Sequence, residues 1–116
     1  MNDNNFLIVT KLKKTIEYID NHLQNFPHKN IELKQRIIKD LFDTLEFCYL
    51  ANNNYDKNNY QLKSIVKLSM IDYYLKISYK KDLISKKQYE LISKHLLEVK
   101  KMIFAWRENE EKKTNI

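Results

Sequence analysis

The chain contains no glycine and a single proline, Pro27, and this absence restricts its fold more than any other feature. Tight hairpin turns use backbone conformations that glycine adopts most easily, and loops that cradle phosphate use glycine where the backbone approaches the ligand. Hairpin-rich sheet proteins, P-loop proteins and dinucleotide-binding folds are therefore disfavoured. The sequence predicts an all-α protein, and its 116 residues suit a single domain, 1–116, with one hydrophobic core.

Four segments repeat apolar residues at alternating intervals of three and four, which is the spacing of a helix with one buried face. The helices are expected at about residues 5–25, 31–52, 59–81 and 86–107, with a charged, frayed tail at 108–116. Short connections place consecutive helices antiparallel. The predicted architecture is therefore an up-down-up-down antiparallel four-helix bundle.

Local signals mark two of the helix ends. Pro27 ends the first helix, because it lacks a backbone donor and disfavours helical geometry in Phe26. Ser85 and Gln88 are spaced as a capping box, in which each side chain accepts a hydrogen bond from the backbone of the other residue. The fourth helix is therefore expected to begin at about residue 86.

The third segment is apolar on two opposite faces when it is wound at about 100° per residue. The first face comprises Leu62, Ile65, Val66, Met70, Tyr73 and Ile77. The second face comprises Leu68, Ile71 and Leu75. A chain of this length has one core to offer, so the second face is predicted to be an oligomer interface, covered by another copy or by a partner protein.

The net charge of +6 favours binding to a polyanion, because clustered cations gain affinity for phosphates by counterion release. A solvated lysine-rich surface, as an AT-rich genome would encode, remains an equal alternative. Seven cations that cluster on the second and third helices are the candidate nucleic-acid contacts: Arg36, Lys39, Lys63, Lys67, Lys76, Lys80 and Lys81. The neighbouring Tyr73, Tyr74 and Tyr79 suit either base stacking or packing at the rim of the core.

No residue pattern indicates catalysis, a metal site or a cofactor site. His22, His28 and His95 have no second ligand at helical spacing, and neither arginine has a histidine four to six residues later, as helical ribonucleases require. Cys48 lies in an apolar run and cannot form an internal disulfide. No apolar run is long enough to span a bilayer and no signal peptide is visible, so we expect a cytoplasmic protein that is not an enzyme.

Several cues occur in a fixed order between about Leu12 and Trp106. They are Phe26-Pro27 at the end of the first helix, Leu33-x-x-Arg36-Ile37 at the opening of the second, Asp82-Leu83-Ile84-Ser85-x-x-Gln88-Tyr89-Glu90 before the fourth, and Trp106 near its end. In this layout the chain resembles the accessory variability determinant (Avd) proteins of diversity-generating retroelements. It is similar too to the wider four-helix-bundle family, which includes proteins encoded in 23S ribosomal RNA intervening sequences.

The resemblance implies a homopentameric barrel that binds nucleic acid, associates with a reverse transcriptase and performs no chemistry itself. Such a subunit scaffolds the polymerase and its template RNA during mutagenic cDNA synthesis. The intervening-sequence branch implies instead a protein-interaction scaffold without specific RNA binding. A third alternative is an antitoxin-like partner of a nucleotidyltransferase or ribonuclease.

Overall fold

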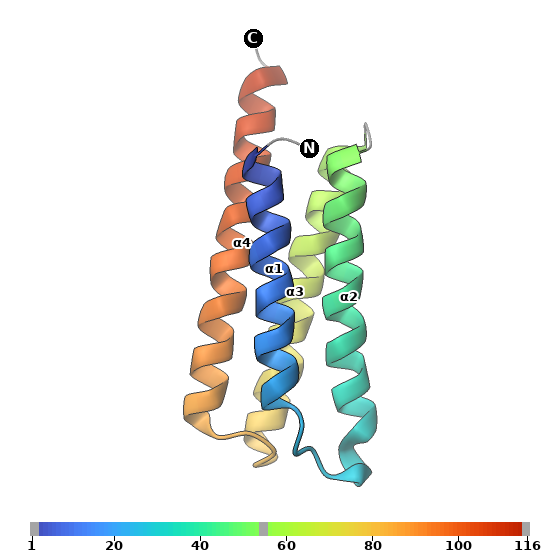
Figure 1. Cartoon of the computed structure of the whole chain (residues 1–116), viewed down its shortest axis with the longest axis vertical. Coiled ribbons are helices and arrows are strands. Elements are labelled where there is room, and N and C mark those ends of the chain that lie inside the picture. The colour runs from blue at the N-terminus through green and yellow to red at the C-terminus, as the bar shows by residue number, and fades with distance from the viewer. Residues whose placement is uncertain (1–2, 54–55, 115–116) are drawn as a thin grey trace.

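The computed structural model describes residues 3–53 and 56–114, and this part of the chain forms four α-helices and one short 3-10 turn. The elements are α1 (Asp3–His22), η1 (His28–Asn30), α2 (Ile31–Asn53), α3 (Lys57–Lys80) and α4 (Lys86–Thr114). Consecutive helices run antiparallel, and the α1–α2 and α3–α4 connections lie at the same end (Figure 1). Each helix packs against two neighbours, so that α1, α2, α3 and α4 follow one another around a bundle of 52 × 22 × 19 Å. None of the described helices combines the length and apolar character needed to cross a bilayer.

Two helix ends differ from the sequence-based expectation by more than two residues. α1 ends at His22 rather than near residue 25, because the Leu23 N–H donates to the carbonyls of both Ile19 and Asp20 and tightens the last turn. The expected frayed tail is instead helical to Thr114. The predicted loop residues 54–55 and tail residues 115–116 lie outside the described residues.

The added turns of α4 are tied to their surroundings by ion pairs. Lys57 Nζ of α3 lies 3.5 Å from Glu110 Oε1, and Arg107 Nη2 lies 4.0 Å from Glu111 Oε1 one helical turn away. The Arg107 guanidinium also donates to Asn58 Oδ1, at 3.0 Å from Nη2. The contacts with Lys57 and Asn58 join the end of α4 to the start of α3. The spacing of apolar residues along one helix does not reveal such contacts between helices.

The core confirms the apolar seams predicted for the first and last helices. The buried residues of α1 and of the segment that follows it include Val9, Leu12, Ile16, Ile19, Leu23 and Phe26. Those of α4 are Ile92, Leu96, Val99, Ile103 and Trp106. α2 contributes Ile37, Leu41 and Cys48, whereas Phe42 on the same helix is 55% exposed.

The structure corrects the predicted oligomer interface on α3. Leu68, Ile71 and Leu75 are 2%, 0% and 0% exposed and lie in the core of their own chain. They are therefore not available to a second copy. The face that was expected to point inward carries the exposed apolar residues of α3 instead, among them Val66 and Tyr73.

Polar residues on the core face of α3 explain this inversion. Gln61, Ser64 and Ser78 are buried beside the apolar residues of that face. The hydroxyls of Ser64 and Ser78 donate to the carbonyls of Tyr60 and Tyr74, at 2.9 and 2.8 Å. Because these hydroxyls are satisfied within their own helix, the serines act as small core residues, although a hydrophobicity pattern reads them as surface.

The α3–α4 connection is held by the predicted capping box and by a helix-ending turn. The Gln88 N–H donates to Ser85 Oγ at 3.0 Å, and the Ser85 N–H donates to Gln88 Oε1 at 2.8 Å. α3 closes with Asp82 at φ 61°, and the Leu83 N–H donates to the Ser78 carbonyl at 2.9 Å. This is a Schellman-type ending with aspartate at a position that glycine usually occupies. It turns the chain sharply and brings the end of α3 beside the start of α4.

Candidate nucleic-acid interface

Two of the predicted phosphate contacts in the middle of the α2–α3 face are held in ion pairs. Lys39 Nζ lies 2.8 Å from Asp43 Oδ2, and Lys67 Nζ lies 3.1 Å from Asp40 Oδ1 and 3.3 Å from Asp43 Oδ2. The hydrogen bond from Lys39, assisted by Lys67, holds the pKa of the Asp43 carboxyl below its ordinary value against the effect of burial. The two cations are matched by two carboxylates, so this part of the face is close to neutral.

Two further predicted cations lie on either side of that neutral section. Lys63 Nζ lies 5.7 Å from the ring centroid of Phe47 and 5.5 Å from that of Tyr60, and the two rings stack 6.2 Å apart. Arg36 is exposed at the opposite end of the face, and hydrogen bonds with Tyr74 and then Glu32 raise the pKa of its guanidinium. Both cations are therefore accessible from solvent beside an aromatic ring.

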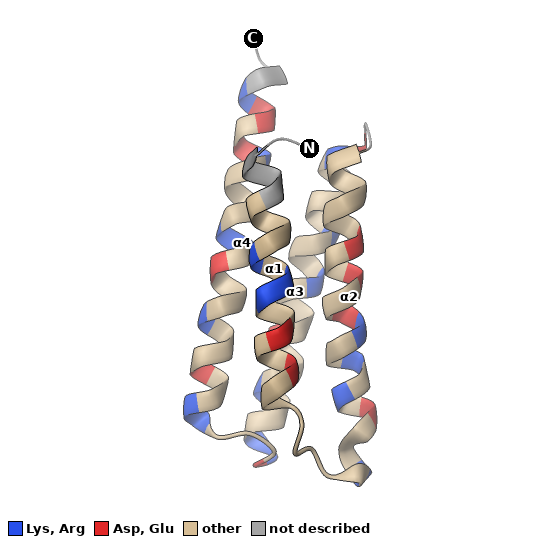
Figure 2. Ribbon diagram, in the orientation of Figure 1, with Lys and Arg blue, Asp and Glu red and all other residues tan. Residues whose placement is uncertain are grey.

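The remaining predicted contacts lie at the end of the bundle that carries both short connections. Lys80 and Lys81 close α3, and Lys76 is one turn earlier on the same helix. Three lysines that sequence reasoning missed reach the same end (Figure 2). The lysines of the connections at this end, termed the basic end below, are Lys29, Lys80, Lys81, Lys86 and Lys87.

The lysines of the basic end are exposed and without ion-pair partners. Among the described residues, none of the five lies within 4 Å of a carboxylate. Asp82 is the one acidic residue in segments 28–31 and 80–87. Lys86 and Lys87 also occupy the first turn of α4, where the helix dipole favours anions and where no acidic residue is present. Positive potential is therefore concentrated at this end.

A shallow groove joins the basic end to the α2–α3 face. It has a volume of about 260 Å³ and lies between the start of α2 and the end of α3. Lys29, Arg36 and Lys81 contribute its cations, and Glu32 contributes its carboxylate. The lining thus places three cations from separate elements within one concave surface, which suits a phosphate group.

An apolar face covers the exposed side of α3 and α4. Its residues are between 39% and 59% exposed and are Leu62, Val66, Met70, Tyr73, Leu97 and Phe104. Along the seam between the two helices, Lys100 Nζ donates to Ser69 Oγ at 2.7 Å and Ser93 Oγ donates to Asp72 Oδ1 at 2.8 Å. These bonds link the two helices beside the exposed apolar side chains.

A second apolar surface, the α2 groove, lies on the opposite side of the bundle. It has a volume of about 430 Å³ and is lined chiefly by Phe42, Leu45, Tyr49 and Leu50. Lys13 of α1 places its Nζ 5.6 Å from the Tyr49 ring centroid, which locates the groove on the α1 side of α2. The α1–α2 and α3–α4 sides are opposite each other in the bundle.

The titratable groups elsewhere are held by structural contacts. The Tyr18 ring lies 4.6 Å from the His22 ring and 4.4 Å from the His95 ring, between α1 and α4. Burial raises the pKa of the Cys48 thiol to about 11. Within the described ranges, no three His, Cys, Asp or Glu side chains lie close enough together to hold a metal ion.

Comparison of the chain with protein-family models, with curated proteins and with solved structures finds no match.

Proposed function

We propose that this chain is a nucleic-acid-binding, oligomeric accessory protein of the Avd type. It would act in the cytoplasm, scaffolding a reverse transcriptase and its template RNA, and perform no chemistry itself. The observation that carries the nucleic-acid part is the basic end, where five lysines from three elements lie together without ion-pair partners in the described structure. The reverse transcriptase and the retroelement come from the sequence resemblance.

Unpaired cations suit phosphate binding better than paired ones. Each lysine that neutralises a phosphate releases condensed counterions, whereas a lysine already in an ion pair must first leave its carboxylate. The proposed contacts are therefore Lys63, Lys76 and the basic end. Arg36 is added because its ion pair with Glu32, at 3.3 Å, joins two exposed side chains one helical turn apart and is readily exchanged for a phosphate. Lys39 and Lys67 are reassigned to a structural role, because both share Asp43.

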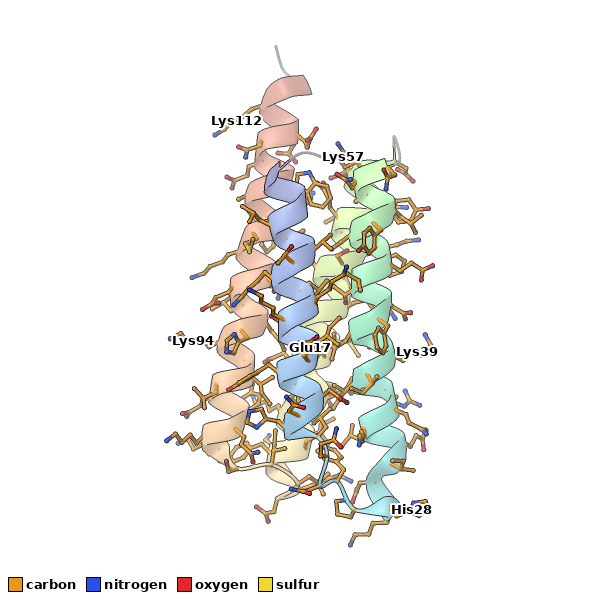
Figure 3. All side chains as sticks on the ribbon, in the orientation of Figure 1. Glu17, His28, Lys39, Lys57, Lys94 and Lys112 are labelled. Atoms are coloured by element: carbon orange, nitrogen blue, oxygen red, sulfur yellow. The ribbon has the colours of Figure 1, made fainter. Side chains whose placement is uncertain are left out.

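Paired charge-removing variants test this assignment. Lys86→Gln combined with Lys87→Gln removes two charges from the basic end, and Lys94→Gln combined with Lys101→Gln removes two exposed charges elsewhere on α4. Figure 3 places Lys94 far from His28, which lies at the basic end. Fluorescence anisotropy with labelled RNA at about 50 to 200 mM salt measures the slope of log K against log salt. Two lost contacts reduce a single-strand slope by about 1.4.

The control variant is expected to keep the original slope. Equal slopes for the two double variants would remove the basic end from the binding surface. No detectable binding of RNA by the unaltered protein at low salt would refute the nucleic-acid function as a whole.

We further propose that copies assemble head to tail into a ring, with the α3–α4 apolar face of one copy against the α2 groove of the next. A closed ring needs two different complementary surfaces, and these two lie on opposite sides of the bundle. Each copy carries a net charge of +6, so like charges repel unless the contact avoids the cationic regions. Five copies are what the family resemblance implies.

Light scattering coupled to size exclusion tests the ring. The unaltered protein is expected to have a mass near five subunits, and Val66→Glu is expected to dissociate it by placing a charge on the apolar face. Leu91→Glu is the matched control, because Leu91 is also exposed, at 40%, but lies on the other side of α4. It is two helical turns from Glu98, which forms an ion pair with Lys11 of α1. A Val66→Glu variant of unchanged mass would contradict the assigned interface.

A second candidate function is a protein-interaction scaffold of the intervening-sequence type. The neutral middle of the α2–α3 face and the exposed apolar face favour it. It predicts self-association without salt-dependent RNA binding, so the same two measurements separate the candidates. A reverse-transcriptase gene beside this one would support the first, and a position within a ribosomal RNA gene would support the second.

A further inference from the structure

The half of the α2–α3 face farther from the basic end carries an aromatic pair beside a cation. Phe47 of α2 and Tyr60 of α3 stack with an interplanar angle of 27°, both rings are half-buried, and the Lys63 ammonium lies over both. Aromatic rings next to a cation form the usual platform for an unpaired base and its phosphate. In the described part of the chain, Lys63 has no carboxylate partner that would compete with a phosphate.

A second aromatic and cation pair lies nearer the basic end on the same face. Arg36 of α2 interacts with Tyr74 of α3, which raises the pKa of its guanidinium, and forms an exposed ion pair with Glu32 at 3.3 Å. Arg36 also lines the groove that contains Lys81. Tyr60 and Tyr74 are separated by about 21 Å at a helical rise of 1.5 Å per residue. The two pairs thus mark the ends of an elongated track that continues into the basic end.

The section between the two pairs does not suit a duplex. A duplex presents one phosphate charge for about every 1.7 Å of its axis and keeps its bases stacked inside. Along the middle of this face it would meet Asp40 and Asp43, whose lysine partners leave the section close to neutral. A flexible single strand can direct its phosphates to the cations at the ends and its bases to the rings.

We propose that the α2–α3 face binds single-stranded nucleic acid, with one unpaired base on the Phe47 and Tyr60 rings beside Lys63. A second base lies near Tyr74 and Arg36, and the backbone leaves through the groove to the basic end. This inference rests on the proposed nucleic-acid binding and specifies the class of ligand for it. In a head-to-tail ring the track stays open, because the proposed contacts use the α1–α2 and α3–α4 sides.

The test compares an unstructured single-stranded RNA with a duplex of the same length, using the oligomer as purified. The single strand is expected to bind at least about tenfold more tightly. Phe47→Leu is expected to weaken single-strand binding by about tenfold, since one stacked base is worth on that order, and to leave duplex binding unchanged. Leu91→Ala is the control, because Leu91 is 40% exposed on α4 and lies outside the α2–α3 face and both proposed ring surfaces.

Lys63→Gln is a second variant that spares the core, because Lys63 is exposed. It is expected to lower the salt slope for the single strand by about 0.7, whereas Lys94→Gln leaves the slope unchanged. Equal or tighter binding of the duplex overturns this inference and leaves the proposed function standing. Equal losses from Phe47→Leu and Leu91→Ala also overturn it. Failure to bind either RNA overturns both this inference and the proposed nucleic-acid binding.

Discussion

The same substitution on the two faces of α3 tests which face builds the core. Leu75 is 0% exposed, so Leu75→Ala removes buried carbon atoms and leaves a cavity, a change that costs about 2.7 to 5 kcal/mol in closely packed cores. Leu62 is 41% exposed, and Leu62→Ala loses a little over half of a transfer free energy of roughly 2 kcal/mol, or about 1 kcal/mol. The two leucines on one helix therefore differ by at least about 1.7 kcal/mol in their contribution to the free energy of unfolding.

Thermal unfolding followed by circular dichroism at several protein concentrations measures this difference. At roughly 4 °C per kcal/mol for a chain of this size, Leu75→Ala lowers Tm by about 12 °C and Leu62→Ala by about 4 °C. If the α3–α4 apolar face binds a second copy, the loss from Leu62→Ala grows with concentration, because association stabilises the folded state by mass action. An equal or larger loss from Leu62→Ala at the lowest concentration would refute the assignment of the two faces.

Three further predictions concern single sites. Ser85→Ala removes the cap of α4 and is expected to cost about 1 kcal/mol in urea unfolding, and a cost below about 0.3 kcal/mol would show that the capping box contributes little. The Cys48 thiol, with its pKa raised by burial to about 11, is expected to react with a disulfide reagent at pH 8 at least about a hundredfold more slowly in the folded than in the unfolded protein. The hydrogen bond from Lys39 lowers the pKa of Asp43 in the folded protein. The ionised carboxylate therefore contributes to the free energy of unfolding above the pKa of the unfolded state, and this contribution is lost as pH falls through the folded pKa. Asp43→Asn is therefore expected to destabilise the protein by less than about 1 kcal/mol at pH 7. The gap should begin to close only below about pH 4 and should vanish as pH falls through the lowered pKa of Asp43, and a gap that stays constant with pH would contradict this reasoning.

The seams of α1 and α4 could be predicted from sequence because their core positions are almost entirely apolar. On α3 the same method selected the wrong face, because it counted Leu62 and Val66 and ignored Ser64 and Ser78. The signal was present: these serines continue the three-and-four spacing of Leu68 and its apolar neighbours. A serine hydroxyl that donates to the carbonyl four residues earlier needs no other hydrogen-bond partner in the core, so serine at such a position is compatible with burial.

The candidate site was only partly predictable for a different reason. Periodicity grouped cations that share a helix, but it contains no information on which carboxylates a neighbouring helix supplies. Asp43 was therefore not seen as the partner of both Lys39 and Lys67. In the same way, Lys29 joins Lys86 and Lys87 only because the two short connections lie at one end of the bundle. Paired charges and converging loops are tertiary properties, and they decide which lysines remain available.

The distribution of residues on α3 supports the proposed contact on its outward face. Monomer stability alone would favour polar residues outside, yet Val66 and Tyr73 are 59% and 55% exposed while Ser64 and Ser78 are buried. Continuous exposed apolar surface promotes association, and a monomer gains nothing from it. The α2–α3 side, by contrast, carries the cations and rings beside Lys63. The two surfaces are separable by experiment: Val66→Glu should change the mass and leave the intrinsic affinity of one subunit for a short single strand unaltered, while Phe47→Leu should do the reverse. Loss of both properties in either variant would mean that assembly itself creates the nucleic-acid site.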